Sequence, residues 1–403
     1  YEYIKWEDQG FRMLTLFKLW NVIEYCFPYT DYTDIPWENL LKKFIPDFFT
    51  VKSKSDYELT ILRLAAHIND SHGYLQFPNK DLSQTILAPL YTYHKFRLPI
   101  ELIHSSEGHI AVKSTNSPLF RKGDIICSID NKSIDSLKAE LQPYIIFSNY
   151  NGFVRNIMPS FLFSETPYRN IAVLRDGKKI EIKFTHPLEF EENKGYNSGK
   201  DLKNKYRDIL KNLNITYINI SDTIADIDRI MHNSFKTKGL IIDMRNTAHN
   251  NGIFSGIGNY LPLTANYPLW LSFNEKEYPG RYIYKRERDF EFNDSPKYEG
   301  KVIIFVNEYV QSGLETWAML CRLSKNSVII GTQTAGANGN VTSIYLPRNI
   351  NFQYTGLGAY YPHWEKLQRE GVKIDIPVYP TIQDIKEGRD VWIEKAIEVI
   401  EGT

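Results

Sequence analysis

The sequence has few cysteines. Its 403 residues include three, Cys26, Cys127 and Cys321, and they form no C-x-x-C pair. The usual patterns of zinc sites and of thioredoxin-like redox sites are therefore missing. A small and odd number of cysteines also argues against a disulfide scaffold.

An excess of charge of one sign and a long apolar run are also lacking. Lys and Arg total 48, and Asp and Glu total 48. General binding to nucleic acid or to an anionic membrane surface needs a basic excess, so neither partner is expected. Since no run of about 18 apolar residues occurs, no membrane-inserted helix is expected. The chain starts at Tyr1 without a signal or transit pattern, which favours a mature form whose targeting segment has been removed.

What the sequence does contain is typical of a globular protein. Hydrophobic residues make up 42% and aromatic residues 14% of the chain, enough for a substantial core. The length suggests two or three domains. Apolar residues recur at helical spacing in residues 10–27, 37–49 and 56–70. We therefore expect a helical N-terminal domain over residues 1–95.

Two changes of pattern follow along the chain. Residues 96–190 hold short alternating runs with turn signals, including a predicted hairpin with its turn at Asp176-Gly177. From residue 191 onward, strands alternate with helices, and Asp222 stands as the expected N-cap of the first helix after a strand. Such alternation predicts parallel strands with crossover helices. The predicted fold class is thus multidomain α+β.

Ser312 is the first residue of interest for chemistry. It follows a buried strand and a short turn, and it opens a helix. Helix N-terminal N–H groups and the partial positive charge there stabilise an oxyanion beside such a hydroxyl. A simpler interpretation is that Ser312 is only the helix N-cap, with Glu315 completing the capping box S-x-x-E.

Residues 306–341 resemble the nucleophile region of the C-terminal-processing-peptidase and tricorn-core family of serine proteases. In both, a strand leads to a serine three residues before a glutamate, and a helix follows. The family's V-I-G-x-x-T-x-G corresponds here to Ile330-Gly331 and Thr334-Ala335-Gly336. Residues 239–252, 121–134 and 371–381 resemble, respectively, the glycine-rich turn, the PDZ core and the tail of that family. The resemblance implies a PDZ-like module over 96–190, a ClpP/crotonase-like catalytic domain over 191–403, and Ser312 as nucleophile.

The choice of base depends on which of the two branches of this family the sequence resembles. The Ser–Lys branch has its lysine at the position of Ala337, so that mechanism is not expected here. The tricorn-like branch uses an early histidine in a D-x-H or S-H element, which corresponds to Ser71-His72. We therefore expect His72 as the base. His67 lies in an apolar stripe and is interpreted as a packing residue, and His249 is a weaker rival.

The resemblance also implies supporting groups. Ser71 would relay between His72 and an acid near the tail, at the position that Gln368 occupies here. An amide fixes a tautomer but cannot stabilise an imidazolium as a carboxylate does. Glu365 and Glu370 are nearby substitutes.

Two backbone N–H groups are expected to form the oxyanion hole. One belongs to Gly313, and the other to the turn near Ala248, where the family's glycines are absent. Asp243 and Arg245, just before that turn, are expected to form structural pairs at the strand end.

The leading hypothesis is a serine endopeptidase that cleaves peptides or unfolded protein tails without a metal or organic cofactor. The resemblance implies a secreted or periplasmic location. The alternative is a catalytically weak or inactive peptide- or ligand-binding protein on the same fold. An esterase of the α/β-hydrolase fold is disfavoured, because Ser312 lies in no G-x-S-x-G elbow. The two main hypotheses differ in whether Ser312 and His72 come within hydrogen-bond reach.

Overall fold

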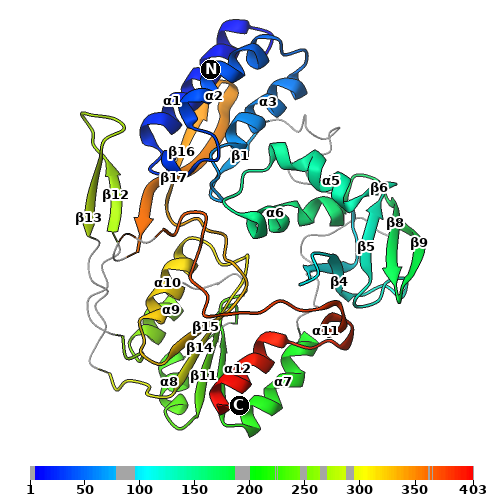
Figure 1. Cartoon of the computed structure of the whole chain (residues 1–403), viewed down its shortest axis with the longest axis vertical. Coiled ribbons are helices and arrows are strands. Elements are labelled where there is room, and N and C mark those ends of the chain that lie inside the picture. Colours follow the sequence, from blue (N-terminus) through cyan, green and yellow to red (C-terminus); the bar gives the residue numbers. More distant parts are fainter. Residues whose placement is uncertain are drawn as a thin grey trace.

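The computed structural model describes residues 5–78, 96–186, 200–245 apart from 223 and 225, 252–263, 270–286, 295–361, and 364–402 apart from 365. Three parts are visible in Figure 1: N-terminal helices beside an antiparallel sheet, a middle module of strands, and a parallel sheet with helices on both faces. The prediction of a multidomain α+β fold with N-terminal helices is therefore confirmed.

The N-terminal helices are α1 (Gln9–Cys26), α2 (Trp37–Phe49) and α3 (Lys54–Ala66), close to the ranges that the apolar spacing predicts. Asp8 caps α1 and Ser53 caps α3, each by accepting a hydrogen bond from a backbone N–H of the first turn. The helices lie against strands from the far end of the chain (Figure 1). The N-terminal unit is thus packed on C-terminal strands.

Those strands form an antiparallel sheet in the order β1-β17-β12-β13, with β16 also paired to β17. Its members are β1 (Tyr74–Gln76), β12 (Trp270–Asn274), β13 (Tyr282–Arg286), β16 (Gly339–Leu346) and β17 (Ile350–Tyr360). Tyr74 pairs with Gln353. Because this pairing is antiparallel, residues just before β1 lie beside the middle of β17.

The middle module contains a sheet in the order β3-β4-β5-β8-β9, with β6 on β5, and a two-stranded pair of β2 and β7. The strands are β2 (Phe96–Arg97), β3 (Ile100–His104), β4 (Ile110–Thr115), β5 (Ile125–Ile129), β6 (Lys132–Ser133), β7 (Phe163–Ser164), β8 (Tyr168–Arg175) and β9 (Lys178–Thr185). Helices α5 (Ile134–Leu141) and α6 (Tyr150–Leu162) accompany them. The predicted hairpin is present: Asp176 and Gly177 join β8 to β9 with φ of 50° and 76°.

The parallel sheet runs in the order β10-β11-β14-β15-β18, and every neighbouring pair is parallel, as predicted. Its strands are β10 (Ile215–Asn219), β11 (Gly239–Asp243), β14 (Lys301–Val306), β15 (Ser327–Gly331) and β18 (Ile376–Pro377). The helices around it are α7 (Lys200–Asn212), α8 (Ile227–Ser234), α9 (Gly252–Gly258), α10 (Gly313–Arg322) and α12 (Val391–Glu401). Shorter helical segments are α11 (Ile382–Glu387), Thr30–Tyr32, Gln142–Tyr144 and Pro347–Asn349.

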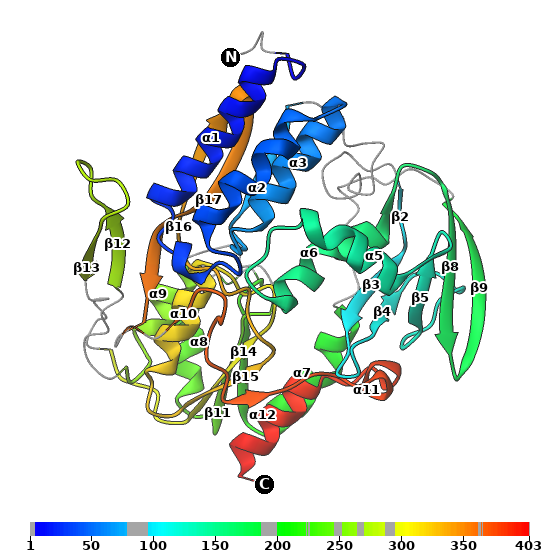
Figure 2. The same ribbon diagram turned by 45° about the horizontal axis from the view of Figure 1, so that its top comes forward.

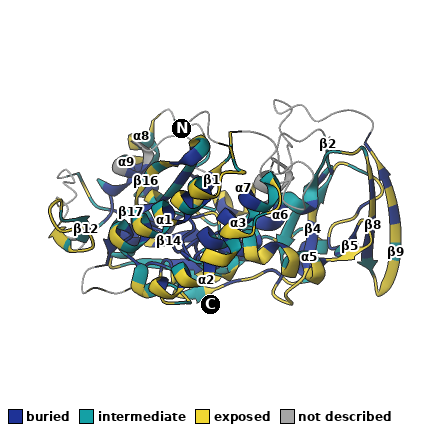
Figure 3. Cartoon of the chain, turned by 90° about the horizontal axis from the view of Figure 1, so that it is seen from above, coloured by how far each residue is buried: buried dark blue, intermediate teal, exposed yellow. Residues whose placement is uncertain are grey.

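Helices cover both faces of this sheet, which explains its continuous apolar strands. Along β14, Ile304 belongs to the core shared with α8, α9 and α10, whereas the preceding Ile303 belongs to the core shared with α7 and α12. Figure 2 shows α7 and α12 together on one side of the sheet. In Figure 3, β14 lies in the buried interior, whereas β9, which carries several exposed residues, lies at one end of the molecule. All residues of β14 after Lys301 are thus buried between the two layers of helices.

One predicted helix start is wrong. The helix α8 is capped by Asp226, whose side chain accepts a hydrogen bond from the N–H of Arg229 at 2.9 Å. Asp222 lies instead in a turn, where the Asn219 side chain accepts hydrogen bonds from the N–H and the hydroxyl of Ser221. The asparagine side chain closes this turn locally and so delays the helix.

Candidate active site

Ser312 lies where β14 ends and α10 begins, as the sequence predicts. It is the N-cap residue of α10, with φ of 59° and ψ of −124°. This conformation is uncommon for a residue with a side chain and costs on the order of 1–3 kcal/mol. Its N–H donates to the carbonyl oxygen of Ala337 at 2.9 Å. A strained serine at a strand-to-helix turn is the geometry by which hydrolases expose a nucleophile.

The Glu315 carboxylate holds the loop behind Ser312. It is fully buried and accepts hydrogen bonds from the Thr334 hydroxyl at 2.5 Å and from the N–H groups of Gly336, Ala337 and Ser312 at 2.9, 3.1 and 3.3 Å. Burial raises the pKa of Glu315 to about 7, although these donors lower it. The part of the predicted capping box that involves Glu315 is therefore confirmed, because its carboxylate accepts a hydrogen bond from the Ser312 N–H.

His72 lies in the turn between α3 and β1, and it is buried. Its Nδ1 is 2.8 Å from the hydroxyl oxygen of Thr355 in β17, and its N–H donates to Asp70 Oδ1 at 3.1 Å. Its Nε2 is buried without a hydrogen-bond partner in the described part of the chain. Burial lowers the pKa of His72; the charge of Asp70 raises it and that of Arg155 lowers it. A ring with a lowered pKa, and with one nitrogen that has no partner among the described residues, has the character of a general base.

A hydrogen bond joins the two segments that carry Ser312 and His72. The side-chain amide of Gln311, which precedes Ser312, donates to the carbonyl oxygen of Ser71, which precedes His72, at 3.2 Å. Both segments also bond to one loop, since Ser71 Oγ donates to Ala335 O at 3.0 Å and Ser312 N to Ala337 O. Residues 240 positions apart are thus brought together.

The Ser71 hydroxyl has partners other than those of the predicted relay. It donates to Ala335 O and accepts from the N–H of Ser148 at 2.9 Å. The ring of His72 contacts Thr355 instead. The reason is the register of β1 on β17, which places Thr355 rather than the tail segment beside the ring.

Gln368 is buried close to this group, but it bonds to Asp70. Its Nε2 donates to Asp70 Oδ1 at 3.3 Å, and its Oε1 is buried without a partner among the described residues. Glu370 is exposed to solvent. Glu365 lies outside the described residues.

Sequence reasoning missed two residues of the site, Asp70 and Thr355. Asp70 is fully buried and accepts hydrogen bonds from the N–H and the hydroxyl of Thr355 at 2.8 and 3.0 Å. A signal for Asp70 existed, because it is the first residue of the D-x-H element that ends in His72. Thr355 gave no local signal.

The remaining predicted groups fall at different places. Gly313 follows Ser312 at the start of α10, and a Cβ there would meet no atom within 4 Å, so the space beside it is open. Ala248 and His249 lie outside the described residues. The ring of His67 lies edge-on to that of Phe44 at 5.8 Å, as expected for a packing residue.

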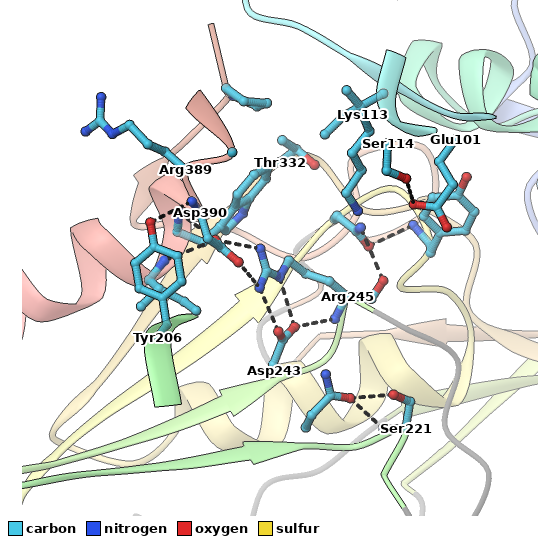
Figure 4. A pocket seen from close by; sticks show the side chains of 18 of the residues that line it. Glu101, Lys113, Ser114, Tyr206, Ser221, Asp243, Arg245, Thr332, Arg389 and Asp390 are labelled. Atoms are coloured by element: carbon cyan, nitrogen blue, oxygen red, sulfur yellow. Dashed lines mark hydrogen bonds and ion pairs between the residues drawn. The ribbon is translucent and has the colours of Figure 1, made fainter. Parts of the chain in front are cut away.

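A cavity of about 1010 Å³ opens between the middle module and the parallel sheet. Figure 4 shows Glu101, Lys113 and Ser114 of the module on one side and residues of the sheet end on the other. Asn307, Glu308 and Tyr309, which lead to Ser312, line it, whereas Ser312 and His72 do not. Arg155 of α6 donates to Glu308 O at 3.0 Å. The cavity is therefore adjacent to the Ser312 segment but separate from it.

At the base of the cavity, Arg245 is paired with two carboxylates (Figure 4). Its guanidinium lies 2.7 Å from Asp243 and 2.9 Å from Asp390, and it stacks over the rings of Phe305 and Trp392. These pairs raise the pKa of Arg245 well above its ordinary value, against burial. The structural role expected for Asp243 and Arg245 is confirmed.

Among the described residues, no group of three or more His, Cys, Asp or Glu side chains is arranged to hold a metal ion. Within the same residues, no helix combines the length and the apolar character needed to cross a bilayer.

Residues 214–378 match the model of peptidase family S41. The matched part contains the parallel sheet and the Ser312 turn. No curated protein matches the chain in sequence.

Solved structures show the same fold over nearly the whole chain. Mature CPAF in complex with lactacystin is 12% identical, with a TM-score of 0.71, covering 98% of this chain and 99% of that chain. A putative peptidase from Parabacteroides merdae ATCC 43184 is 14% identical, with a TM-score of 0.53, and covers 98% and 97%. The tricorn protease is 15% identical, with a TM-score of 0.52, and covers 98% of this chain and 37% of that chain. At these identities the likeness concerns the fold.

Proposed function

We propose that this chain is a serine endopeptidase that cleaves peptides or unfolded protein tails, with Ser312 as nucleophile and His72 as base. The observation that carries the proposal is the hydrogen bond from Gln311 to Ser71, which joins the residues directly before the two catalytic candidates. Two further observations support it: His72 Nε2 has no hydrogen-bond partner in the part of the chain that the structure describes, and the backbone of Ser312 is strained. The match of residues 214–378 to the model of peptidase family S41 makes a peptide bond the expected target.

The proposed reaction begins with attack of Ser312 Oγ on the scissile carbonyl carbon. His72 Nε2 takes the hydroxyl proton and then gives it to the leaving amine, so the acyl group is left on the serine. Water then attacks the acyl-enzyme, His72 again moves the proton, and the free acid leaves. The N–H of Gly313 is the proposed oxyanion donor on the serine side, and a backbone N–H near Ala248 would be the second. The proposal includes no metal or organic cofactor.

The middle module is proposed to be PDZ-like and to present substrate. Its strand β3 is at one edge of its sheet and lines the cavity beside the Ser312 segment. An extended peptide adds to such an edge through backbone hydrogen bonds. The parallel-sheet unit is likewise proposed to be ClpP/crotonase-like. A secreted or periplasmic location is part of the proposal and derives from the family resemblance alone.

A second candidate is a peptide- or ligand-binding protein without peptidase activity. It is favoured by Gln368, an uncharged amide at the position that the family resemblance gives to an acid, and by the 1010 Å³ cavity. Such a protein would keep the fold and bind ligands without turnover.

Cleavage of reduced casein separates the two candidates. The chain, Ser312→Ala and His72→Ala are assayed together, with labelling by a fluorophosphonate probe as a second readout. We expect cleavage and labelling by the chain and loss of both in the two variants. Equal cleavage by all three proteins would contradict the assignment of Ser312. Binding of casein without cleavage or labelling would favour the second candidate.

A further inference from the structure

The ring of His72 is linked to a buried carboxylate through a hydroxyl group. Thr355 Oγ1 lies 2.8 Å from His72 Nδ1 and 3.0 Å from Asp70 Oδ1. Asp70 is fully buried and also accepts hydrogen bonds from the N–H groups of His72 and Thr355 and from Gln368 Nε2. Four donors thus satisfy a buried acid in the interior.

The sheet register explains why these residues meet. Tyr74 pairs with Gln353 and Leu75 with Phe352, so each step back along the chain before β1 is a step forward along β17. Two steps back from Tyr74 is His72, and two steps forward from Gln353 is Thr355. Asp70 lies in the same turn as His72, and its carboxylate reaches the backbone N–H of Thr355 at 2.8 Å.

The hydroxyl proton settles which nitrogen of His72 is protonated. Both oxygens of Asp70 accept backbone N–H groups, so the carboxylate acts as an acceptor toward the Thr355 hydroxyl as well. The single hydroxyl proton of Thr355 therefore goes to Asp70, and its oxygen can only accept from the ring. In the neutral ring, His72 must then carry its proton on Nδ1, which leaves Nε2 free.

We propose that Thr355 and Asp70 are positioning residues that fix His72 in the tautomer with a basic Nε2. This proposal rests on the proposed function, because it assigns the orientation of the base in that same site. The hydroxyl of Ser71 is already used by Ala335 and Ser148, so it does not take this role. Gln368 supports the carboxylate of Asp70 rather than the ring.

The arrangement also answers how a site with glutamine at position 368 supports an imidazolium. The charged groups that act on His72 are Asp70, on its own segment, and Arg155, on α6. Asp70 favours the protonated ring and Arg155 disfavours it. When Nε2 takes a proton, the Asp70 carboxylate stabilises the new charge through the Thr355 hydroxyl, and Nδ1 keeps its hydrogen bond.

The first test compares Thr355→Val, Thr355→Ser and Asp70→Asn with the unaltered chain in peptide cleavage. We expect kcat to fall about 10²-fold or more in Thr355→Val with little change in KM, since a misplaced general base loses this much. Thr355→Ser, which keeps the hydroxyl, should retain most of the rate. In Asp70→Asn, loss of the negative charge should shift the acid limb of the kcat profile to lower pH. Thr342→Val makes the same change on the neighbouring β16 and should leave the rate intact.

The second test measures the tautomer directly and does not depend on catalysis. The ¹⁵N shifts of the His72 ring are recorded above its pKa, and its signals among the nine histidines are assigned from their loss in His72→Gln. We expect protonated Nδ1 and unprotonated Nε2, and a mixture of tautomers in a folded Thr355→Val.

The two tests separate the failures of the two proposals. If the chain shows no Ser312-dependent cleavage but the ring is protonated on Nδ1, the endopeptidase proposal fails and the positioning role is upheld. If Ser312-dependent cleavage is intact in Thr355→Val, or if the proton lies on Nε2, the positioning role is overturned.

Discussion

Replacement of Glu315 by glutamine tests whether the loop behind Ser312 is held by a buried carboxylate. In the native protein, Oε1 accepts from the Thr334 hydroxyl and the Gly336 N–H, and Oε2 accepts from the N–H groups of Ala337 and Ser312. A glutamine keeps one acceptor oxygen. Its NH₂ group must then face two donors, and two hydrogen bonds are lost.

The expected loss follows from these contacts. A hydrogen bond to a charged group contributes about 1.5–3 kcal/mol, so the two lost bonds correspond to about 3–6 kcal/mol. Removal of a buried charge returns part of this, because burial raises the pKa of Glu315 to about 7 and its ionised form is costly. The net expected loss in the free energy of unfolding is about 2–4 kcal/mol at pH 7.

The pH dependence of this loss has a defined sign. Since the folded pKa of Glu315 lies above its unfolded value of 4.5, the contribution of this group to stability falls as pH rises from 4.5 to about 7. Glutamine has no such dependence. The stability gap between the native chain and Glu315→Gln should therefore be wider at pH 5 than at pH 8.

Thermal unfolding followed by tryptophan fluorescence at pH 5 and pH 8 measures both quantities. A loss of 2–4 kcal/mol lowers Tm by about 4–16 °C for a unit of about 200 residues. The matched control is Glu140→Gln, which removes an exposed ion pair with Lys132 at 2.7 Å and should cost about 1 kcal/mol or less. Melting of Glu315→Gln at the native temperature, or a gap that widens as pH rises, would refute the reasoning.

Three other changes give distinct outcomes. Gly331→Ala puts a Cβ 1.9 Å from a backbone oxygen of β14 and should lower the free energy of unfolding by about 3 kcal/mol or more. Its control, Gly177→Ala, is also at positive φ but in open space and should cost about 1 kcal/mol. Equal urea midpoints for the two variants would contradict this. Burial lowers the pKa of His186 to about 4, so its contribution to stability is present above pH 6.5 and is lost as pH falls toward 4. In His186→Phe, the free energy of unfolding measured with urea should therefore fall less steeply between pH 6.5 and 4. An unchanged slope would be evidence against this. Asp390→Asn keeps the α12 cap but breaks a two-point contact with Arg245, which should lower the free energy of unfolding by about 1–3 kcal/mol. An unaltered urea midpoint would show that Asp243 alone is enough to hold Arg245.

The local features of the fold were predictable from the sequence because they arise from local chemistry. The apolar spacing of residues 37–49 gave α2 with its bounds, since a helix face repeats every few residues. The Asp176-Gly177 turn predicted its hairpin because both residues tolerate positive φ. The place of Ser312 at a strand end followed from a buried strand, a turn and a capping pattern.

The sequence failed where a nearby side chain competed with the expected cap. Asp222 has the residue type of an N-cap, but the Asn219 side chain holds a turn there, and Asp226 caps the helix instead. Choosing between two acids four residues apart depends on how the preceding strand ends, and the residue types alone do not give this.

What only the tertiary structure decided is the environment of His72. The sequence by itself determined that a histidine and an acid stand together in D-x-H, and that a serine opens a helix after a buried strand. It did not determine that Thr355, 283 positions away, contacts the ring. That contact depends on the antiparallel register of β1 on β17, and a shift of one residue would turn Thr355 to the other face of the sheet. Register is fixed by the packing of the N-terminal helices and the sheet together, so the partner of the base follows from the assembled fold.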